Sequence, residues 1–328
     1  MSRGRKAGLS VTGSARALVR ALRGRDVNWS IGIYGGQSPW SFTSPGIKDP
    51  ALSAADVTDV LAGFVADPFM LHENENWYMF FEVWNIVSRR GNIGLATSRD
   101  AVHWKYEQIV LDEPFHLSYP YVFKWEGEYY MLPESRRASS VKLYKASNFP
   151  RKWLAVKDLM QGDYADPSIL YFDDLWWLFV LIGMDELALY YSHSLDGPWN
   201  RHPKNPLISN NRRISRPGGR MVVYNGRIVR YAQDGVPTYG NQLRAFEIDT
   251  LTTTDYQEHE VAESPILKAS GKGWNANGMH HIDPHPVSEN RWIACVDGNG
   301  ERRPLGDLLG SFFLYLAGRN MDCSSADE

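Results

Sequence analysis

Short apolar runs alternate with polar turns along most of the chain, and the pattern returns about every fifty residues. Each repeat begins with a residue followed by proline and an apolar run, then passes through a polar turn into an aromatic run. Five such openings occur: Ala66-Asp67-Pro68, Ser118-Tyr119-Pro120, Ala165-Asp166-Pro167, Ser215-Arg216-Pro217 and Ile282-Asp283-Pro284. Short runs joined by Asn-, Asp- and Gly-containing turns are typical of antiparallel strands. The pattern therefore predicts five antiparallel β-meanders.

A repeat of this length is typical of propeller blades, so the chain is predicted to be an all-β, five-bladed β-propeller. Second strands are expected at 77–82, 129–133, 176–181, 227–233 and 291–296. A strand at 29–34 precedes the first blade, and we expect it to complete the fifth blade as its outer strand, because ring closure protects strand edges. A further strand of the last blade is expected at 311–316. Tryptophans that follow the third strands, such as Trp153, are expected to pack between neighbouring blades.

Helical periodicity is confined to the amino terminus and to residues 53–61, which disfavours a doubly wound α/β fold. The predicted organisation is a basic extension over 1–28, the propeller over 29–318 and a polar tail over 319–328. We expect the extension to be solvated and partly disordered. The alternative is a short basic amphipathic helix at 15–22 that touches a membrane or an acidic partner.

Composition narrows the function classes. The net charge of −3 has no basic footprint beyond the first residues, so no nucleic-acid partner is expected. No apolar stretch is long enough to span a bilayer, and the amino-terminal segment lacks the apolar core of a secretion signal, which favours a cytoplasmic location. Two cysteines outside any Cys/His cluster indicate neither a disulfide scaffold nor a zinc site. The 12 Trp and 17 Tyr suit packing between sheets and stacking on sugar rings.

Charged residues recur at two places in the repeat. The openings supply Asp67, Tyr119, Asp166, Arg216 and Asp283, and the ends of the second strands supply Glu82, Glu134, Gln233 or Asp234, and Asp297. Because inner strands surround the propeller axis, we expect these side chains to converge on one central face. Crowded carboxylates raise each other's pKa, and such pairs cleave glycosidic bonds. A single Asp before Pro can simply cap a turn, but three at matching positions favour function.

The remaining candidates are histidines and arginines. His280 and His281, with His285 after them, could hold a metal or transfer a proton, although hydrogen bonding to substrate hydroxyls is favoured over metal binding. Arg216 could bind a phosphate or carboxylate, or neutralise neighbouring acids. The predicted substrate-binding residues are Glu82, Trp84, Tyr119, Arg216, Arg220, His280 and His281. No cofactor is expected, and a central divalent cation is left open.

Two resemblances rest on particular motifs. Ala66-Asp67-Pro68, followed by Asp166-Pro167-Ser168-Ile169, resembles the family 43 glycoside hydrolases and related five-bladed glycosidases over most of residues 60–318. A closer likeness is to the amino-terminal domain of plant glucosamine inositolphosphorylceramide transferases and to bacterial propellers joined to sugar formyltransferases. This likeness is carried by the run 77–82, by Met131-Leu132-Pro133-Glu134-Ser135 and by His281-Ile282-Asp283-Pro284.

The family 43 resemblance implies a base or nucleophile Asp in the first blade, a pKa-tuning Asp in the second and an acid Glu in the third. Asp67 matches the first, but Tyr119 and Asp166 stand at the other two positions. We therefore expect Asp67 as base or nucleophile, Glu134 as substitute acid, and Asp166 and Asp283 setting charge and orientation.

Three functions follow from these expectations. The leading hypothesis is a carbohydrate-active, glycoside hydrolase-like protein that acts on a glycan or glycoconjugate. The alternative is a non-catalytic propeller that recognises a glycan or sugar nucleotide for a transferase partner in surface-polysaccharide or glycolipid synthesis. A protein-interaction propeller ranks last, because it would not need converging acids on its central face.

Overall fold

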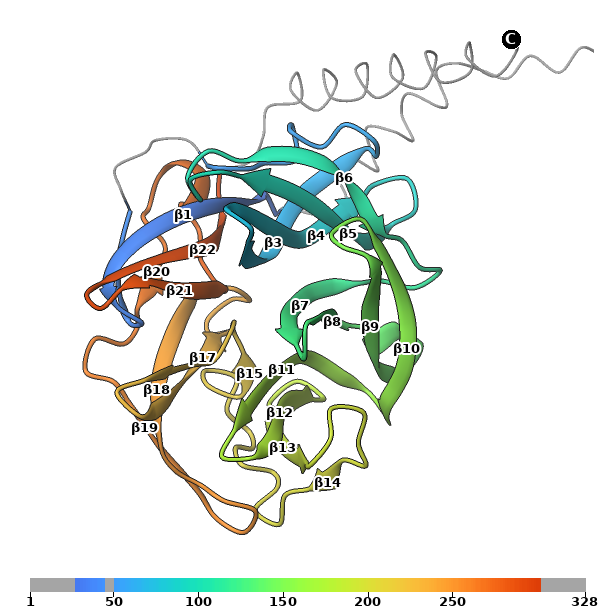
Figure 1. Cartoon of the computed structure of the whole chain (residues 1–328). Helices are drawn as coiled ribbons and strands as arrows, with labels where there is room; N and C mark the ends of the chain where they lie inside the picture. Colours follow the sequence, from blue (N-terminus) through green and yellow to red (C-terminus); the bar gives the residue numbers. More distant parts are fainter. Residues whose placement is uncertain (1–26, 45–49, 302–328) are drawn as a thin grey trace, which may run out of the picture.

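The computed structural model describes residues 27–44 and 50–301. The predicted strand at 311–316, the polar tail and the basic extension up to residue 26 lie outside the described residues. Within the described ranges, five antiparallel sheets are arranged around a central axis (Figure 1), so the predicted five-bladed β-propeller is confirmed.

The first three blades each contain four strands in chain order from the axis outward. The first comprises β3 (Ala62–Glu73), β4 (Asn76–Asn85), β5 (Arg90–Ser98) and β6 (Lys105–Leu111). The second comprises β7 (Ser118–Trp125), β8 (Glu128–Glu134), β9 (Ser140–Asn148) and β10 (Lys152–Gln161). The third comprises β11 (Tyr164–Phe172), β12 (Leu175–Ile182), β13 (Glu186–Ser192) and β14 (Asn200–Arg201).

The fourth blade is more broken than the others. It comprises β15 (Arg216–Pro217), β16 (Val222–Tyr224), β17 (Arg227–Asp234), β18 (Gln242–Leu251), β19 (Tyr256–Glu260) and β20 (Leu267–Lys268). Both β15 and β16 pair with β17, so the inner edge of this blade is made by two short pieces. Two single turns of 3-10 helix, η1 (Arg136–Ala138) and η2 (Gly273–Asn275), are the helical elements of the described residues.

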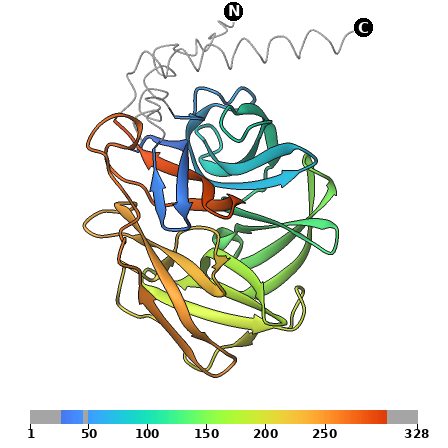
Figure 2. The ribbon, with the colours of Figure 1, turned by 60° about the vertical axis from the view of Figure 1, so that its left-hand side comes forward.

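The fifth blade closes the ring with the two ends of the described chain. It joins β21 (Ile282–Ser288) and β22 (Arg291–Asn299) to β1 (Trp29–Ser38) and β2 (Ser41–Thr43). β1 and β22 run side by side (Figure 2), from Trp29 opposite Asn299 to Gly36 opposite Trp292. The expected membership of β1 in this blade is confirmed, but its outer position was wrong. The first six residues of β1 are buried, and β2 is the outermost strand.

Two further expectations can be compared with the structure. Residues 53–61 form turns rather than a helix, because Asp56 accepts hydrogen bonds from the Ser53 amide and hydroxyl at 2.8 and 3.0 Å and closes a tight turn. The predicted hairpin turns are confirmed: Asn74 and Glu75 link β3 to β4 with φ of 49° and 63°. Two successive positive φ values are what a two-residue hairpin turn requires.

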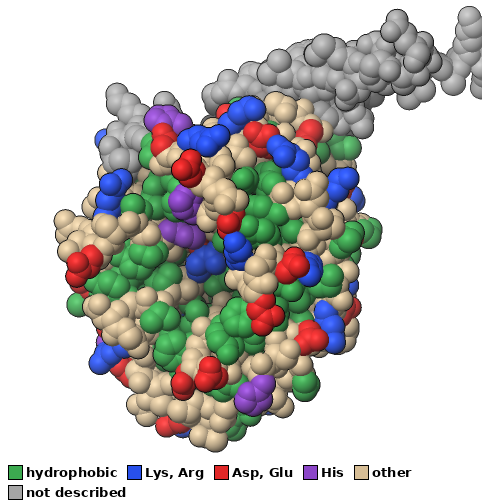
Figure 3. All heavy atoms as spheres, viewed as in Figure 1, with side chains coloured by type: hydrophobic (Ala, Val, Ile, Leu, Met, Phe, Trp, Pro, Cys, Tyr) green, Lys and Arg blue, Asp and Glu red, His purple; other side chains and the backbone are tan. Residues whose placement is uncertain are grey.

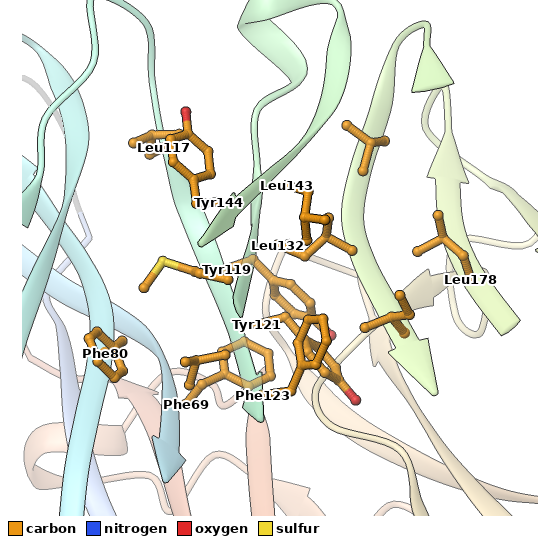
Figure 4. Close-up of a cluster of buried hydrophobic side chains, with 14 of the residues drawn as sticks. Phe69, Phe80, Leu117, Tyr119, Tyr121, Phe123, Leu132, Leu143, Tyr144 and Leu178 are labelled. Atoms are coloured by element: carbon orange, nitrogen blue, oxygen red, sulfur yellow. The ribbon is translucent and has the colours of Figure 1, made fainter. Parts of the chain in front are cut away.

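Apolar side chains fill the space between adjacent blades. Figure 4 shows one such cluster, in which Phe69 of β3 and Tyr121 of β7 lie close together near Leu132 of β8. The ring of Trp153, at the outer edge of the second blade, lies 5.4 Å from the Phe80 ring of the first blade, edge to face. The expected inter-blade role of this tryptophan is confirmed, and the packed interfaces hold the inner strands at fixed positions around the axis.

Candidate functional site: a carboxylate cluster on the propeller axis

The inner strands of the first three blades share a local distortion. The strand register shifts around Asp67 in β3, Tyr119 in β7 and Asp166 in β11, and these residues have φ of 52°, 48° and 48°. A non-glycine residue in this left-handed region costs about 1–2 kcal/mol. Bulges commonly re-aim a side chain next to a functional site. Here the bulge turns the residue before proline out of the regular strand alternation.

Asp166 and Glu134 form the first part of the cluster, together with an arginine. Arg216 donates to both Asp166 carboxylate oxygens, one of them at 3.3 Å, and its Nη2 lies 3.8 Å from Glu134 Oε2. Gln233 adds a second donor to Asp166 at 2.8 Å. Asp166 is therefore fully engaged, whereas Glu134 Oε2 is buried without a hydrogen-bond partner among the described residues.

Asp67 forms the second part, with two histidines behind it. Its Oδ1 lies 3.8 Å from His280 Nε2 and 4.0 Å from His281 Nδ1 and has no hydrogen-bond partner among the described residues. His280 is held by the Asp297 carboxylate at 2.8 Å through Nδ1 and by the Tyr239 hydroxyl at 2.9 Å through Nε2. Asp297 and Tyr239 thus fix the imidazole that faces Asp67.

The surroundings separate the ionisation of these carboxylates. Burial raises the pKa of Asp67 to about 7, although the His280 charge opposes this and Asp297 adds to it. Burial and the neighbouring Asp166 charge raise the pKa of Glu134 well above its usual range. Burial would also raise the pKa of Asp166, but Arg216 outweighs it and holds that pKa below its usual range. Glu134 therefore keeps its proton to a higher pH than a free glutamic acid, Asp166 loses its proton at a lower pH than a free aspartic acid, and Asp67 is close to its midpoint at neutral pH.

This distribution of charge suits acid–base chemistry. A protonated carboxyl can donate to a leaving oxygen, and a carboxylate that titrates near the working pH can accept a proton or attack carbon. Asp67 and Glu134 are 6% and 8% exposed, so both side chains are mostly desolvated.

A pocket of about 690 Å³ opens beside this cluster. Its lining includes Glu134 and Arg216 from the cluster and Trp84, one of the predicted substrate-binding residues. Glu82, another of them, is buried and lies 3.8 Å from His116 Nε2, and His116 also lines the pocket. A pocket of this size accommodates a small ligand such as a sugar unit.

Asp283 lies outside the cluster, contrary to the expectation that it shares the face of Asp67 and Asp166. The ladder is regular from Ile282 to Pro286, with Asp283 opposite Cys295, so no bulge at Asp283 turns its side chain toward the pocket. It accepts hydrogen bonds from Arg220, His285 and the Met70 amide. Burial would raise the pKa of Asp283, but Arg220 and His285 lower it to about 2.

Arg220 belongs to the same separate group, which we call the axial brace: Arg220, Asp283 and His285. Arg220 also donates to the carbonyls of Val122 at 2.8 Å and Met70 at 3.3 Å, and so ties together the inner strands of three blades. His285 therefore does not join His280 and His281, as a single histidine cluster would require. On the face drawn in Figure 3, histidine, basic and acidic side chains gather near the middle of the ring.

Tyr119 and His281 are completely buried and offer no surface to a ligand in this conformation. The Tyr119 hydroxyl bonds to Ser168 Oγ at 2.7 Å, accepts from the Gly219 amide at 2.7 Å and donates to the Gly219 carbonyl at 3.1 Å. Gly219 itself has φ of 145°, and a Cβ there would lie 1.8 Å from the Ile282 carbonyl oxygen. Tyr119 thus links the second, third and fourth blades where the fourth meets the fifth.

Three residues of the described chain could hold a metal ion: Asp67, His280 and Asp297 offer ligand atoms within 4.8 Å of one another. However, both ring nitrogens of His280 are already hydrogen-bonded, to Asp297 and Tyr239. A cation bound through His280 would have to displace one of these partners. The arrangement as it stands is a hydrogen-bonded chain from Asp297 through His280 to Tyr239.

Several residues at the site were missed by sequence reasoning. Tyr239 lies on the loop between β17 and β18, outside the repeat, and no sequence signal marks it. Arg89, Arg136 and Arg137 line the pocket from the turns that follow β4 and β8. The sequence does carry a signal for these, because Ser-Arg-Arg occurs in both turns, at 88–90 and 135–137.

Solved structures define the class of fold. A glycosyl hydrolase from Bacteroides ovatus matches 77% of this chain and 92% of its own chain, with a TM-score of 0.55 and 11% identity. The catalytic domain of a GH62 α-L-arabinofuranosidase from Coprinopsis cinerea matches 84% of this chain and 97% of its own, with a TM-score of 0.52 and 11% identity. At these identities the likeness establishes the fold alone, which is that of the glycoside hydrolase-like five-bladed propellers.

The family is shown by sequence. A family model described as Glucosamine inositolphosphorylceramide transferase 1, N-terminal, matches residues 23–299, and the chain belongs to this family. Proteins named Glucosamine inositolphosphorylceramide transferase 1 from Oryza sativa subsp. japonica and Arabidopsis thaliana are 36% and 35% identical over 317 and 320 residues. These matches cover 88% of this chain but 42% and 41% of the relatives, so the chain spans about two fifths of their length. In the described ranges, no helix has the length and apolarity needed to cross a bilayer.

Proposed function

We propose that this propeller acts on a glycan or glycoconjugate through acid–base chemistry at a glycosidic bond. The observation that carries the proposal is a pair of buried carboxyl groups in one cluster with raised pKa values, about 7 for Asp67 and well above the usual range for Glu134, which lines the pocket. Glycosidic cleavage needs such a pair, one group as acid and the other as base or nucleophile. The glycoside hydrolase-like fold agrees with this chemistry.

Each member of the cluster has a part in the proposed reaction. Glu134 donates its proton to the leaving glycosidic oxygen, and Asp67 activates water or attacks the anomeric carbon. The ionised Asp166 keeps the pKa of Glu134 high, while Arg216 prevents Asp166 itself from taking the proton. Asp297 holds His280 in place by a hydrogen bond, and the imidazole of His280 faces Asp67.

A second candidate is a recognition propeller that binds a glycan without cleaving it and serves a glycan transferase. This reading is favoured by Asp166, which stands at the acid position of family 43 but is neutralised by Arg216 and Gln233. It is also favoured by Tyr119, which is buried where a pKa-tuning Asp would stand. The relatives named as transferases extend well beyond the region matched by this chain.

The test is a screen of the purified protein against aryl glycosides and bacterial surface oligosaccharides, with turnover and binding measured separately. Asp67→Asn and Glu134→Gln are compared with Asp174→Asn and Glu128→Gln, whose exposed side chains lie away from the pocket on the third and second blades. We expect both site variants to lower turnover at least about a hundredfold while the control variants retain it.

Binding of an oligosaccharide with no turnover in the wild-type protein would reject the catalytic proposal and support recognition. Turnover that survives both site substitutions would reject the assignment of the two carboxylates. Calorimetric titration of the same oligosaccharides distinguishes these outcomes, because binding is measured independently of cleavage.

A further inference from the structure

The pocket beside the carboxylate cluster is lined by four arginines. They are Arg89 from the first blade, Arg136 and Arg137 from the second and Arg216 from the fourth. A neutral sugar does not need this much positive charge, because its hydroxyl groups are satisfied by ordinary hydrogen bonds. The acid–base chemistry proposed above uses only Arg216.

Two of the four arginines are already neutralised. Arg216 pairs with Asp166 at the base of the cluster. Arg136 holds both oxygens of Asp163, one of them at 2.7 Å, and also donates to the Gly183 carbonyl at 3.1 Å. These contacts attach the turn η1 to the third blade. Arg136 is therefore a fixed support of the pocket wall.

Arg89 and Arg137 make no ion pair within the described residues, and both side chains are exposed at the pocket. The acidic lining residues lie against other arginines, because Asp163 is engaged by Arg136 and Glu134 Oε2 lies 3.8 Å from Arg216 Nη2. His116, a further lining residue, lies against Glu82. The pocket lining therefore includes two arginines, Arg89 and Arg137, that have no ion-pair partner among the described residues.

The local sequence explains how the two free guanidinium groups reach one pocket. The Ser-Arg-Arg motif follows the second strand in both the first and the second blade, so the two turns occupy equivalent places on adjacent blades. Arg89 has φ of 56°, and Ser139 ends η1 with φ of 53°. These tight turns keep the arginines beside the ends of β4 and β8, where Glu82 and Glu134 lie.

We propose that Arg89 and Arg137, with Arg136 as a fixed neighbour, bind a doubly charged phosphate group carried by the glycan ligand next to Glu134. A phosphate monoester carries a charge of about −1.5 to −2 at neutral pH, which matches two unpaired arginines, whereas a carboxylate carries only one. The planar guanidinium fork also suits the oxygens of a phosphate. The inference rests on the proposed function, since it places the phosphate on the ligand of the same pocket.

The test compares ligands that differ only in the phosphate. Binding of glucose, galactose and glucosamine is measured by calorimetry beside their 1- and 6-phosphates, glucuronate and inorganic phosphate. The double variant Arg89→Gln/Arg137→Gln is compared with Arg99→Gln/Arg291→Gln, which removes two exposed arginines that do not line the pocket. Thermal unfolding of both double variants shows whether the fold is retained.

We expect at least one sugar phosphate to bind at least about tenfold more tightly than its neutral sugar, and the pocket double variant to lose that advantage. The control double variant should keep it. Equal binding of sugar phosphates by both double variants would overturn the proposal. Inorganic phosphate that binds as tightly as every sugar phosphate would also overturn it, because the site would then not recognise a phosphate borne by a glycan.

The two proposals fail separately. If Glu134→Gln leaves turnover unchanged but the pocket double variant loses sugar phosphate binding, the phosphate site is supported and the catalytic role of Glu134 is rejected. If Glu134→Gln abolishes turnover of neutral glycosides while sugar phosphates bind no better than neutral sugars, the catalytic role stands and the phosphate site falls.

Discussion

The first three blades and the last two carry the same residue-before-proline signature and place it differently. In β3, β7 and β11 a bulge holds Asp67, Tyr119 and Asp166 at positive φ and breaks the strand register. In β15 and β21 the ladder is regular at the residue before proline, with Arg216 opposite Gln233 and Asp283 opposite Cys295. The bulged strands supply two of the carboxylates of the cluster, Asp67 and Asp166, and the fourth and fifth blades together supply the axial brace.

The difference teaches that position in a repeat fixes distance from the axis but not the direction of a side chain. Asp67 and Asp283 occupy equivalent repeat positions and are both buried. Their partners nevertheless shift the pKa in opposite directions, to about 7 for Asp67 and to about 2 for Asp283. A strained, unpaired carboxylate is suited to chemistry, whereas a fully paired one is suited to holding the structure.

The largest expected effect is on the axial brace. Arg220→Ala leaves Asp283 as a buried charge with one partner fewer and removes two hydrogen bonds to strand carbonyls. Breaking a buried pair in this way costs about 3–5 kcal/mol of unfolding free energy, measurable by urea denaturation.

Arg216→Ala is the matched comparison, because Asp166 keeps its hydrogen bond from Gln233 and the site is open to the pocket. We expect a smaller loss of stability for this variant. Equal losses of unfolding free energy in the two variants would contradict the distinction between the carboxylate cluster and the axial brace.

A smaller effect is expected at Tyr119, the bulged residue that does not face the pocket. Tyr119→Phe removes the hydroxyl that satisfies the buried Gly219 amide and Ser168. Loss of a buried hydrogen-bond partner costs about 1–3 kcal/mol. Unfolding by urea should show this loss, while glycan turnover or binding by the folded protein stays at the wild-type level.

Tyr171→Phe is the control, since Tyr171 is exposed near the end of β11, and its hydroxyl makes only a 3.5 Å contact with Asp174 of the following turn, so its removal should change stability little. If Tyr119→Phe abolished glycan turnover without lowering stability, Tyr119 would have a direct part in the site instead of the structural one described above.

Sequence periodicity was sufficient to predict the fold, since the spacing of the five openings predicts a ring of five blades. It was also sufficient to predict the location of the site, since the same repeat places Asp67, Glu134, Asp166 and Arg216 near the propeller axis. It could not predict the direction of Asp283, because Asp-Pro occurs both in bulged and in regular strands. Tyr239 could not be predicted as a site residue, because it lies on a loop that is not part of the repeat. The two Ser-Arg-Arg motifs are visible in the sequence, but only the structure shows that both turns lie beside one pocket.

The smallest expected effect separates Asp67 from Asp283 by pH. The folded-state pKa of Asp67, about 7, lies above its ordinary value of 3.8, so the protonated form stabilises the fold, and this contribution is lost as pH rises through 7. The folded-state pKa of Asp283, about 2, lies below 3.8, so its contribution is present above pH 4 and is lost as pH falls toward 2. The pKa of His280 is raised, chiefly by Asp297 and against the effect of burial. Its contribution to stability is therefore also lost as the pH rises, as for Asp67.

Urea denaturation of the wild-type protein should therefore show a loss of about 1 kcal/mol between pH 6 and pH 7, beyond the loss seen in Asp67→Asn. Asp174→Asn, an exposed substitution in the third blade, should retain the wild-type slope. Identical slopes in the wild-type protein and Asp67→Asn would mean that Asp67 is ionised across this range. That result would remove the reason for treating Asp67 as a base that works near neutral pH, and would make the contrast with Asp283 one of position alone.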